Sequence, residues 1–168
     1  TVTVGKANTT TTIASDTPDP SVVGQAVTVN YSVAVSAPGT GTPTGNVTVS
    51  DGTVSCTGTV AAGSCSLTFT SAGAKTLTAT YAGDSNFNGS TSAGASHQVD
   101  KADTTTTITS DTPDPSVVGQ SVTVNYSVAV SAPGTGTPTG NVTVSDGTVS
   151  CTGTVAAETG RASRRERG

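Results

Sequence analysis

The chain has little charge and few aromatic side chains. Charged residues make up 11% of the sequence and aromatic residues 3%, and there is no Met and no Trp. The first 157 residues carry nine Asp and three Lys, which gives this part a net charge of −6. An acidic chain lacks the clustered basic side chains that neutralise a phosphate backbone. We therefore expect no nucleic-acid partner.

Long apolar runs and helical periodicity are also missing. No apolar segment approaches the roughly 20 residues that a helix needs to cross a bilayer, so we expect no membrane span in this chain. No window shows the apolar spacing of an amphipathic helix, which predicts essentially no helix. The chain starts at Thr1 without a Met or a signal peptide, so we expect it to be a piece of a longer protein.

Residues that carry catalysis or bind metals are sparse. His97 is the single histidine. A lone histidine in a predicted strand indicates a surface position rather than a Ser-His-Asp site. Two closely spaced cysteines and a distant histidine lack the paired spacing of zinc ligands. Gly39 and Gly41 are followed by neither a helix nor a lysine, so they form no phosphate-binding loop. We expect no enzyme, no catalytic residues and no resident cofactor.

What the sequence does contain is a long internal repeat. Residues 6–62 match residues 101–157 at an offset of 95, with three differences over these 57 positions. A period of 95 suits one small β-sandwich per repeat. Residues 7–101 then form a complete repeat, and residues 102–157 form the N-terminal part of a second, truncated repeat. Residues 1–6 align with residues 96–101 and predict the last strand of an upstream repeat.

Residues 158–168 depart from the repeat. They read ETGRASRRERG and hold all four arginines of the chain, for a net charge of +2. We interpret this segment as a non-repeat basic tail. It is either an artefact, such as a frameshift, or a natural tail that lies on an anionic surface.

Valine and threonine are the most frequent residues, and they alternate. Between residues 26 and 35, apolar side chains occupy every second position, a period of two that is typical of antiparallel strands with one buried face. Prolines at positions 18 and 20, Asp51-Gly52 and residues 61–63 separate the apolar segments as turns. The pattern predicts seven or eight strands in an all-β, two-sheet antiparallel sandwich.

The cysteines predict one covalent crosslink. Cys56 and Cys65 fall on the inward faces of predicted adjacent strands that meet at the turn 61–63, so we predict a cross-strand disulfide. The alternative is a pair of reduced, buried thiols. A disulfide indicates an oxidising compartment. Cys151 is the copy of Cys56, and the position of its partner is Gly160, so we expect Cys151 to be a free thiol.

Several ordered segments resemble one known family. Those segments are TTTTI (Thr9–Ile13), TPDPSVVGQ (Thr17–Gln25), PTGNVTV (Pro43–Val49) and ATYAGDSNF (Ala79–Phe87). Together they resemble bacterial immunoglobulin-like (Big) repeats, which occur in tandem arrays in secreted or surface-anchored proteins. The resemblance implies an immunoglobulin-like β-sandwich and an extracellular or cell-surface location. It also implies that the hydroxyl of Tyr81 is tied to a loop.

Three functions remain open at this stage. The first is a structural spacer or stalk whose partners are the neighbouring repeats of the same protein. The second is an adhesive module that binds a surface glycan or protein through an outward threonine face, such as Thr76, Thr78 and Thr80. The third is a filament subunit that self-associates when Thr1–Lys6 adds a strand to another copy. Asp100 and Asp103, at the junction of the repeats, are weak calcium candidates.

Overall fold

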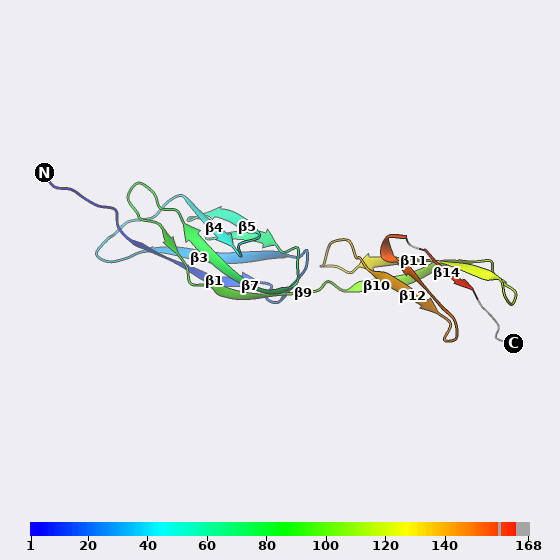
Figure 1. Cartoon of the computed structure of the whole chain (residues 1–168). Helices are drawn as coiled ribbons and strands as arrows, with labels where there is room; N and C mark the ends of the chain where they lie inside the picture. The colour runs from blue at the N-terminus through cyan, green and yellow to red at the C-terminus, as the bar shows by residue number, and fades with distance from the viewer. Residues whose placement is uncertain (158, 164–168) are drawn as a thin grey trace. The chain divides into compact units, whose positions relative to one another are not determined.

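The computed structural model of the chain describes residues 1–157 and 159–163. The chain divides into unit 1 (Thr1–Lys101) and unit 2 (Ala102–Gly168), and the division falls where the second sequence copy begins (Figure 1). In the described residues the single helical segment is a 3₁₀ turn, η1 (Val155–Ala157). That part of the chain contains no helix long and apolar enough to cross a membrane.

Unit 1 is a sandwich of two sheets. One sheet has the order β1-β3-β6, and the other has the order β2-β9-β7-β4-β5, with β8 paired to β7. All pairs are antiparallel except β2 and β9, which run parallel over two residues, a small departure from the antiparallel sheet expected. The strands are β1 (Thr9–Thr17), β2 (Ser21–Val22), β3 (Ala26–Val35), β4 (Asn46–Ser50), β5 (Ser55–Thr59), β6 (Ser64–Thr68), β7 (Gly73–Tyr81), β8 (Ser90–Thr91) and β9 (Ala95–Asp100).

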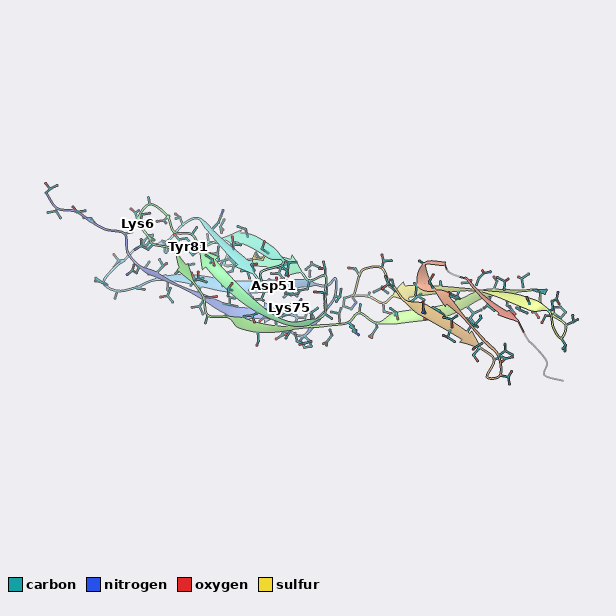
Figure 2. The ribbon with its side chains drawn as sticks, viewed as in Figure 1. Lys6, Asp51, Lys75 and Tyr81 are labelled. Carbon is teal, nitrogen blue, oxygen red and sulfur yellow. A yellow bond between two sulfur atoms is a disulfide. The ribbon has the colours of Figure 1, made fainter. Side chains whose placement is uncertain are left out.

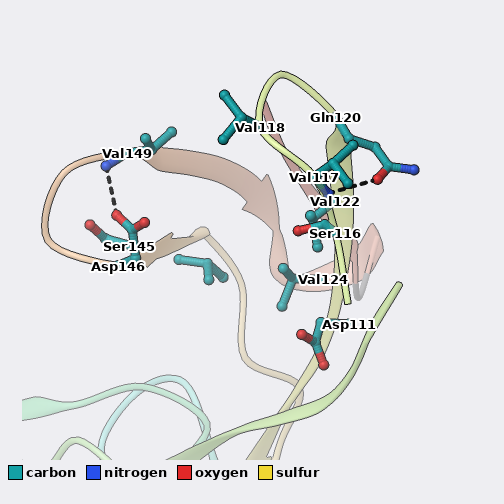
Figure 3. Close-up of a pocket in the computed structure, with 11 residues that line it drawn as sticks. Asp111, Ser116, Val117, Val118, Gln120, Val122, Val124, Ser145, Asp146 and Val149 are labelled. Carbon is teal, nitrogen blue, oxygen red and sulfur yellow. Dashed lines mark hydrogen bonds between the residues drawn. The ribbon is translucent and has the colours of Figure 1, made fainter. Parts of the chain in front are cut away.

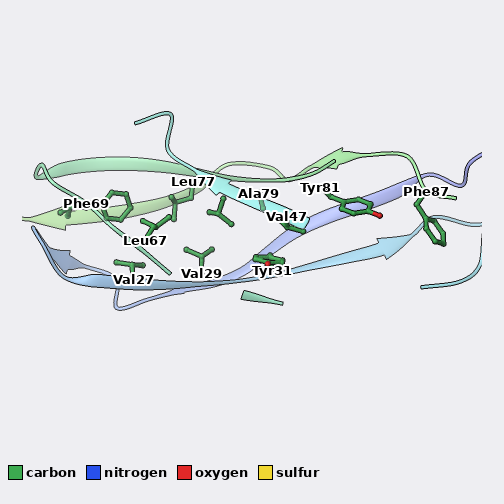
Figure 4. Packing of buried hydrophobic residues seen from close by; sticks show 12 residues of the cluster. Val27, Val29, Tyr31, Val47, Leu67, Phe69, Leu77, Ala79, Tyr81 and Phe87 are labelled. Atoms are coloured by element: carbon green, nitrogen blue, oxygen red, sulfur yellow. The ribbon is translucent and has the colours of Figure 1, made fainter. Parts of the chain in front are cut away.

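The core lies between these two sheets and follows the alternation of the sequence. In β3, successive residues from Ala26 to Tyr31 are alternately exposed and buried, so that valines point inward and polar side chains point to solvent. Figure 4 shows the inward side chains of both sheets meeting in one layer. The buried apolar residues of unit 1 are Val27, Val29, Tyr31, Val47, Val49, Leu67, Phe69, Leu77, Ala79, Tyr81, Phe87 and Val99.

A glycine in β5 allows a buried tyrosine to reach the backbone. The Tyr31 hydroxyl lies 3.0 Å from the carbonyl oxygen of Thr59 and 3.3 Å from that of Ser64. A Cβ on Gly58 would lie 2.4 Å from this hydroxyl and 2.3 Å from the Ser64 oxygen. Gly58 is therefore required by close approach, and burial raises the pKa of Tyr31.

The expected disulfide is present, but its place in the fold differs from the prediction. Cys56 and Cys65 are bonded, with their Cα atoms 5.8 Å apart. Cys56 lies opposite Val49 in one sheet, whereas Cys65 lies opposite Val29 in the other. The crosslink therefore joins the two sheets rather than two neighbours in one sheet. The prediction of adjacent strands was wrong because the short turn at residues 61–63 carries the chain from one sheet to the other.

Unit 2 repeats the first half of this arrangement. Its strands β10 (Thr104–Thr112) and β11 (Ser121–Val130) pair as β1 and β3 do, and β12 (Asn141–Ser145) pairs with β13 (Ser150–Thr154). The segment β14 (Thr159–Ser163) pairs with β11 with Gly160 opposite Val124. In unit 1 the corresponding pair is Cys65 opposite Val29, so part of the predicted non-repeat tail takes the position and register of β6.

The same residues are more exposed in unit 2 than in unit 1. Val27 and Val49 are fully buried, whereas their copies Val122 and Val144 are only partly buried. Ile13 is partly buried, but its copy Ile108 is 58% exposed. The described residues of unit 2 include no counterpart of β7 or β9, the strands that cover these positions in unit 1.

Residues 1–6 form no strand in this structure. Val2 and Val4 are 91% and 88% exposed, and the first backbone pairing in the chain is a bridge between Ala7 and Phe87. The assignment of these residues as the last strand of an upstream repeat stays a prediction.

Removing the crosslink should weaken unit 1. We expect the double change Cys56→Ala and Cys65→Ala to lower the free energy of unfolding of unit 1 by about 2–3 kcal/mol, because the unfolded chain loses a closed loop. Denaturant unfolding followed by circular dichroism under non-reducing conditions measures this. Cys151→Ala, which touches no crosslink, is the control and should leave the transition of unit 1 in place. An unchanged midpoint in the double variant would contradict the role of the crosslink.

Candidate functional site

One end of unit 1 holds a buried cluster of polar side chains around His97. The imidazole Nε2 lies 2.8 Å from Ser21 Oγ, and Nδ1 lies 2.5 Å from Asp16 Oδ2. Asp19 Oδ1 lies 3.4 Å from the same Nδ1 and also accepts a hydrogen bond from the Gln98 backbone N–H. The His97 side chain is fully buried, whereas Asp19 is 39% exposed.

The expectation of a surface histidine was wrong. His97 and Val99 occupy alternate positions of β9, and both point toward the core, where their exposed fractions are 2% and 0%. The His97 ring stacks on Phe69, with centroids 5.0 Å apart. Burying an imidazole is tolerated here because both ring nitrogens have hydrogen-bond partners. The alternation of β9 carried this signal, since it places position 97 on the same face as Val99.

A β-bulge brings the acidic partner to His97. The register of β1 against β3 shifts between Ile13 and Ser15, so that one extra residue enters β1. Beyond the shift, Asp16 lies opposite Val29, a fully buried residue of β3. An extra residue reverses the alternation of a strand and re-aims the side chains that follow it. The bulge thereby turns the Asp16 carboxylate inward toward His97.

The cluster has the residue types of a Ser-His-Asp site but lacks access to its nucleophile. Ser21 is 1% exposed, so a substrate has no route to its hydroxyl in this conformation. Nucleophilic catalysis requires the serine oxygen and a set of oxyanion donors to face the reacting carbonyl. What the arrangement provides is a hydrogen-bonded link between β1, β2 and β9.

The opposite end of unit 1 is organised by Asp84. Its Oδ2 accepts hydrogen bonds from the Thr44 backbone N–H and hydroxyl, each at 2.9 Å. Its Oδ1 accepts from the backbone N–H groups of Asn86 and Phe87. These bonds, above all the one from the Thr44 N–H, hold the pKa of Asp84 well below its usual range against the smaller opposing effect of desolvation.

The Tyr81 hydroxyl is tied to a loop at this same end, as the resemblance implied. It donates a hydrogen bond of 2.8 Å to the carbonyl oxygen of Thr44. Burial, followed by the neighbouring Asp84, raises the pKa of Tyr81. Lys6 Nζ donates to the Asp84 carbonyl oxygen at 2.6 Å, and Figure 2 shows Lys6 and Tyr81 near one end of unit 1. The N-terminal segment that enters the module is thus fixed to the loop that contains Asp84.

Other predicted sites are placed as follows. The threonine face of β7 does point outward, with Thr76 and Thr80 exposed and Thr78 partly buried. The Thr80 hydroxyl interacts with that of Thr91 across the strands. Asp100 and Asp103 belong to different units, and calcium binding there stays a prediction. Cys151 is a buried free cysteine, and a Cβ on Gly160 would lie 3.1 Å from its sulfur.

Unit 2 contains a groove of about 390 Å³ that is partly apolar (Figure 3). Some of its walls correspond to residues that pair with β9 or β7 in unit 1: Ser21–Val22 pairs with β9, and Val49 and Ser50 pair with β7. In unit 1 the copies of Val122, Val124 and Val144 are fully buried. The residues that line the groove are Asp111, Ser116, Val117, Val118, Gln120, Val122, Val124, Val144, Ser145, Asp146 and Val149.

Asp84→Asn should destabilise unit 1 at neutral pH, because the amide keeps one acceptor oxygen and its NH₂ group cannot accept the two hydrogen bonds made by the other carboxylate oxygen. A carboxyl whose pKa is lowered by folding stabilises the fold above its unfolded pKa and loses this contribution as the pH falls. The difference between wild type and variant should therefore narrow below about pH 4. Thermal unfolding across this pH range measures it, with Asp114→Asn as control. A difference that stays constant with pH would contradict the prediction.

Comparison with known proteins gives one family match. Residues 11–100 match the family model described as bacterial Ig-like domain (group 3). A solved structure of the fibronectin(III)-like modules of Clostridium thermocellum CbhA is similar, with 18% sequence identity and a TM-score of 0.40; the match covers 73% of this chain and 63% of that chain. No curated protein matches. Since the family match extends over more than half of the sequence, the chain belongs to the bacterial Ig-like domain (group 3) family.

Proposed function

We propose that the chain is a structural spacer of a secreted or surface-anchored bacterial protein, in which Ig-like modules extend a stalk. The observation that carries this proposal is the position of the two points at which the chain enters and leaves unit 1. The incoming chain is fixed by two hydrogen bonds, from Lys6 Nζ to the carbonyl oxygen of Asp84 and from the Ala7 N–H to the carbonyl oxygen of Asn86. The outgoing chain leaves at Asp100, whose carbonyl oxygen accepts a hydrogen bond from the Val23 N–H.

These two points lie at opposite ends of the sandwich. The N–H of Gly24, the neighbour of Val23, donates a hydrogen bond to the carbonyl oxygen of Phe69. The point where the chain leaves unit 1 therefore lies at the Phe69 end of the core. Figure 4 shows Phe69 and Phe87 at opposite ends of the core. Strand β3 has ten residues and spans roughly 33 Å at a rise of about 3.3 Å per residue. When the chain enters and leaves each module at opposite ends, every further module lengthens the array. This arrangement suits a spacer better than a catalytic domain.

The extracellular setting of this proposal is supported by the family and by the crosslink. Bacterial Ig-like domains are typical of extracellular or surface proteins and are generally non-catalytic. The Cys56–Cys65 disulfide suits an oxidising compartment. The shielded Ser21 hydroxyl is consistent with a role that involves no catalytic step.

A spacer must resist tension, and pulling on the ends of the chain tests this. We expect unit 1 to unfold in one discrete step at higher force than unit 2, because in unit 1 both sheets enclose the core. Cys56 and Cys65 are nine positions apart in sequence, and the segment between them cannot extend until the disulfide is reduced. Reductant should lengthen the step by about 3 nm, from an extended length of about 3.6 Å per residue.

Single-molecule force spectroscopy of the full chain makes this measurement. The variant Cys56→Ala with Cys65→Ala is the matched control and should show the longer step without reductant. Gradual extension of unit 1 without a discrete step would overturn the spacer role.

A second candidate is self-association, and two specific observations favour it. The first is the groove of unit 2 in the place that β7 and β9 occupy in unit 1. The second is the exposure of Val2 and Val4, which align with the inward positions His97 and Val99 of β9. We propose that Thr1–Lys6 of one copy lies along this groove in another copy, beside Ser116–Val117, as β9 lies beside β2 in unit 1.

Substitutions on the two faces of this segment test the exchange. Val2→Asp with Val4→Asp should abolish concentration-dependent oligomers, because carboxylates would replace the inward apolar side chains in a groove that already contains Asp111. Thr1→Asp with Thr3→Asp adds the same charge on the opposite face and should leave the oligomers largely intact. Analytical ultracentrifugation over a range of concentrations reports both. A wild-type chain that stays monomeric at all concentrations, or an equal effect of both pairs, would show that the exchange is wrong.

A further inference from the structure

We propose that Asp16, Asp19 and His97 form a binding site for one divalent transition-metal ion of the zinc class. Each residue offers one ligand atom, and these three atoms lie within 4.8 Å of one another. One imidazole nitrogen and two carboxylate oxygens form a donor set that suits zinc and its neighbours. Calcium prefers six to eight oxygen ligands, so this set does not favour it.

The histidine is already held as a metal ligand requires. Its ring stacks on Phe69, and its Nε2 lies 2.8 Å from Ser21 Oγ. Metal-bound histidines almost always hydrogen-bond through the second ring nitrogen, which fixes the tautomer and the ring orientation. Without an ion, the hydrogen bond to Asp16 requires the proton on Nδ1. With an ion bound, that proton would lie on Nε2 and be donated to the Ser21 hydroxyl, and the Nδ1 lone pair would face the ion. Ser21 is therefore assigned as the positioning residue of the site.

The two separations that involve His97 require little rearrangement, and the oxygens of Asp16 and Asp19, which lie within 4.8 Å of each other, would move closer by at most about 1.5 Å. Ligands bound to zinc at about 2.0–2.1 Å in a tetrahedron lie roughly 3.3 Å apart. The separation of His97 Nδ1 from Asp19 Oδ1, 3.4 Å, already fits this value. The separation from Asp16 Oδ2, 2.5 Å, is that of a hydrogen bond and would widen by less than about 1 Å. The ion would replace the Nδ1 proton of that hydrogen bond.

Charge and access also favour a cation. In the described part of the chain, the ion pairs of Asp16 and Asp19 are with His97, and neither carboxylate pairs with a lysine or an arginine. With neutral His97 the cluster carries two negative charges, which one divalent ion balances. Asp19 is 39% exposed, so an ion reaches the cluster from its side, and water can fill the remaining positions.

A bound ion would link the segments that bear the outgoing end of the module. Asp16 is the penultimate residue of β1, Asp19 lies in the following turn, and His97 lies on β9. The ion would therefore crosslink segments about 80 residues apart in sequence, as the disulfide crosslinks the two sheets elsewhere. Extracellular zinc would then tune the stiffness of each module, a role that goes beyond the spacer function.

Calorimetric titration of the full oxidised chain with zinc chloride tests the proposal. We expect one zinc ion per chain and an upward shift of the unfolding midpoint of unit 1. His97→Gln keeps a hydrogen-bonding side chain in the core but removes the nitrogen ligand, so binding should be lost. Asp19→Asn, at a partly exposed position in a turn, should weaken zinc binding at least tenfold even if His97→Gln fails to fold.

The repeat provides the matched control for this experiment. Asp114 is the copy of Asp19 in an identical local sequence, TPDPSVVGQ, but the described part of unit 2 contains no histidine. Asp114→Asn should leave both the stoichiometry and the affinity unchanged. Absence of binding to the wild-type chain, binding retained in His97→Gln, or equal losses in Asp19→Asn and Asp114→Asn would each overturn the site.

Discussion

Burial of one shared valine layer between two sheets is the constraint on which the other features of unit 1 depend. The inner faces of both sheets carry mostly small aliphatic side chains, and each sheet alone would leave them in water. The two units show this directly, because residues 7–62 of unit 1 and residues 102–157 of unit 2 differ at three positions only. Val27 is fully buried, whereas its copy Val122 is only partly buried where β7 and β9 have no described counterpart. Identical residues thus owe their burial to strands far away in sequence.

The same non-local dependence extends to secondary structure. Ser21–Val22 forms β2 because β9 runs beside it, with Ser21 opposite Val99. The copy, Ser116–Val117, forms no strand, although the flanking sequence is identical. Conversely, Thr159–Ser163 lies outside the sequence repeat but pairs with β11 as a strand. An edge of unpaired backbone groups accepts whatever extended segment reaches it. Pairing partners, rather than local propensity, decide these short strands.

The limits of sequence reasoning follow from this dependence. Alternation predicted the inward valines of β3 and the hairpin at Asp51-Gly52, since both are local patterns. It also identified Cys56 and Cys65 as partners. It failed on the sheet that each cysteine belongs to, because a short turn can either return a strand to its neighbour or carry it across the core. It failed on the Asp16–His97 contact for a similar reason, because the two residues are 81 positions apart in sequence and a bulge re-aims the Asp16 side chain.

The two polar clusters fix the ends of a modest core. Packed valines keep the two sheets together, but they do little to stop one sheet from sliding past the other, since each dispersion contact is weak and has little directional preference. Hydrogen-bonded groups at each end are directional: Asp84 and Tyr81 fix the loops where the chain arrives, and His97 with Asp16 and Ser21 fixes the strands where it leaves. Tension that enters beside Lys6 and leaves beyond Asp100 meets these clusters before it reaches the valines. For the proposed spacer, directional hydrogen bonds at the two ends of the module would therefore oppose sliding of the sheets where the pulling force is applied.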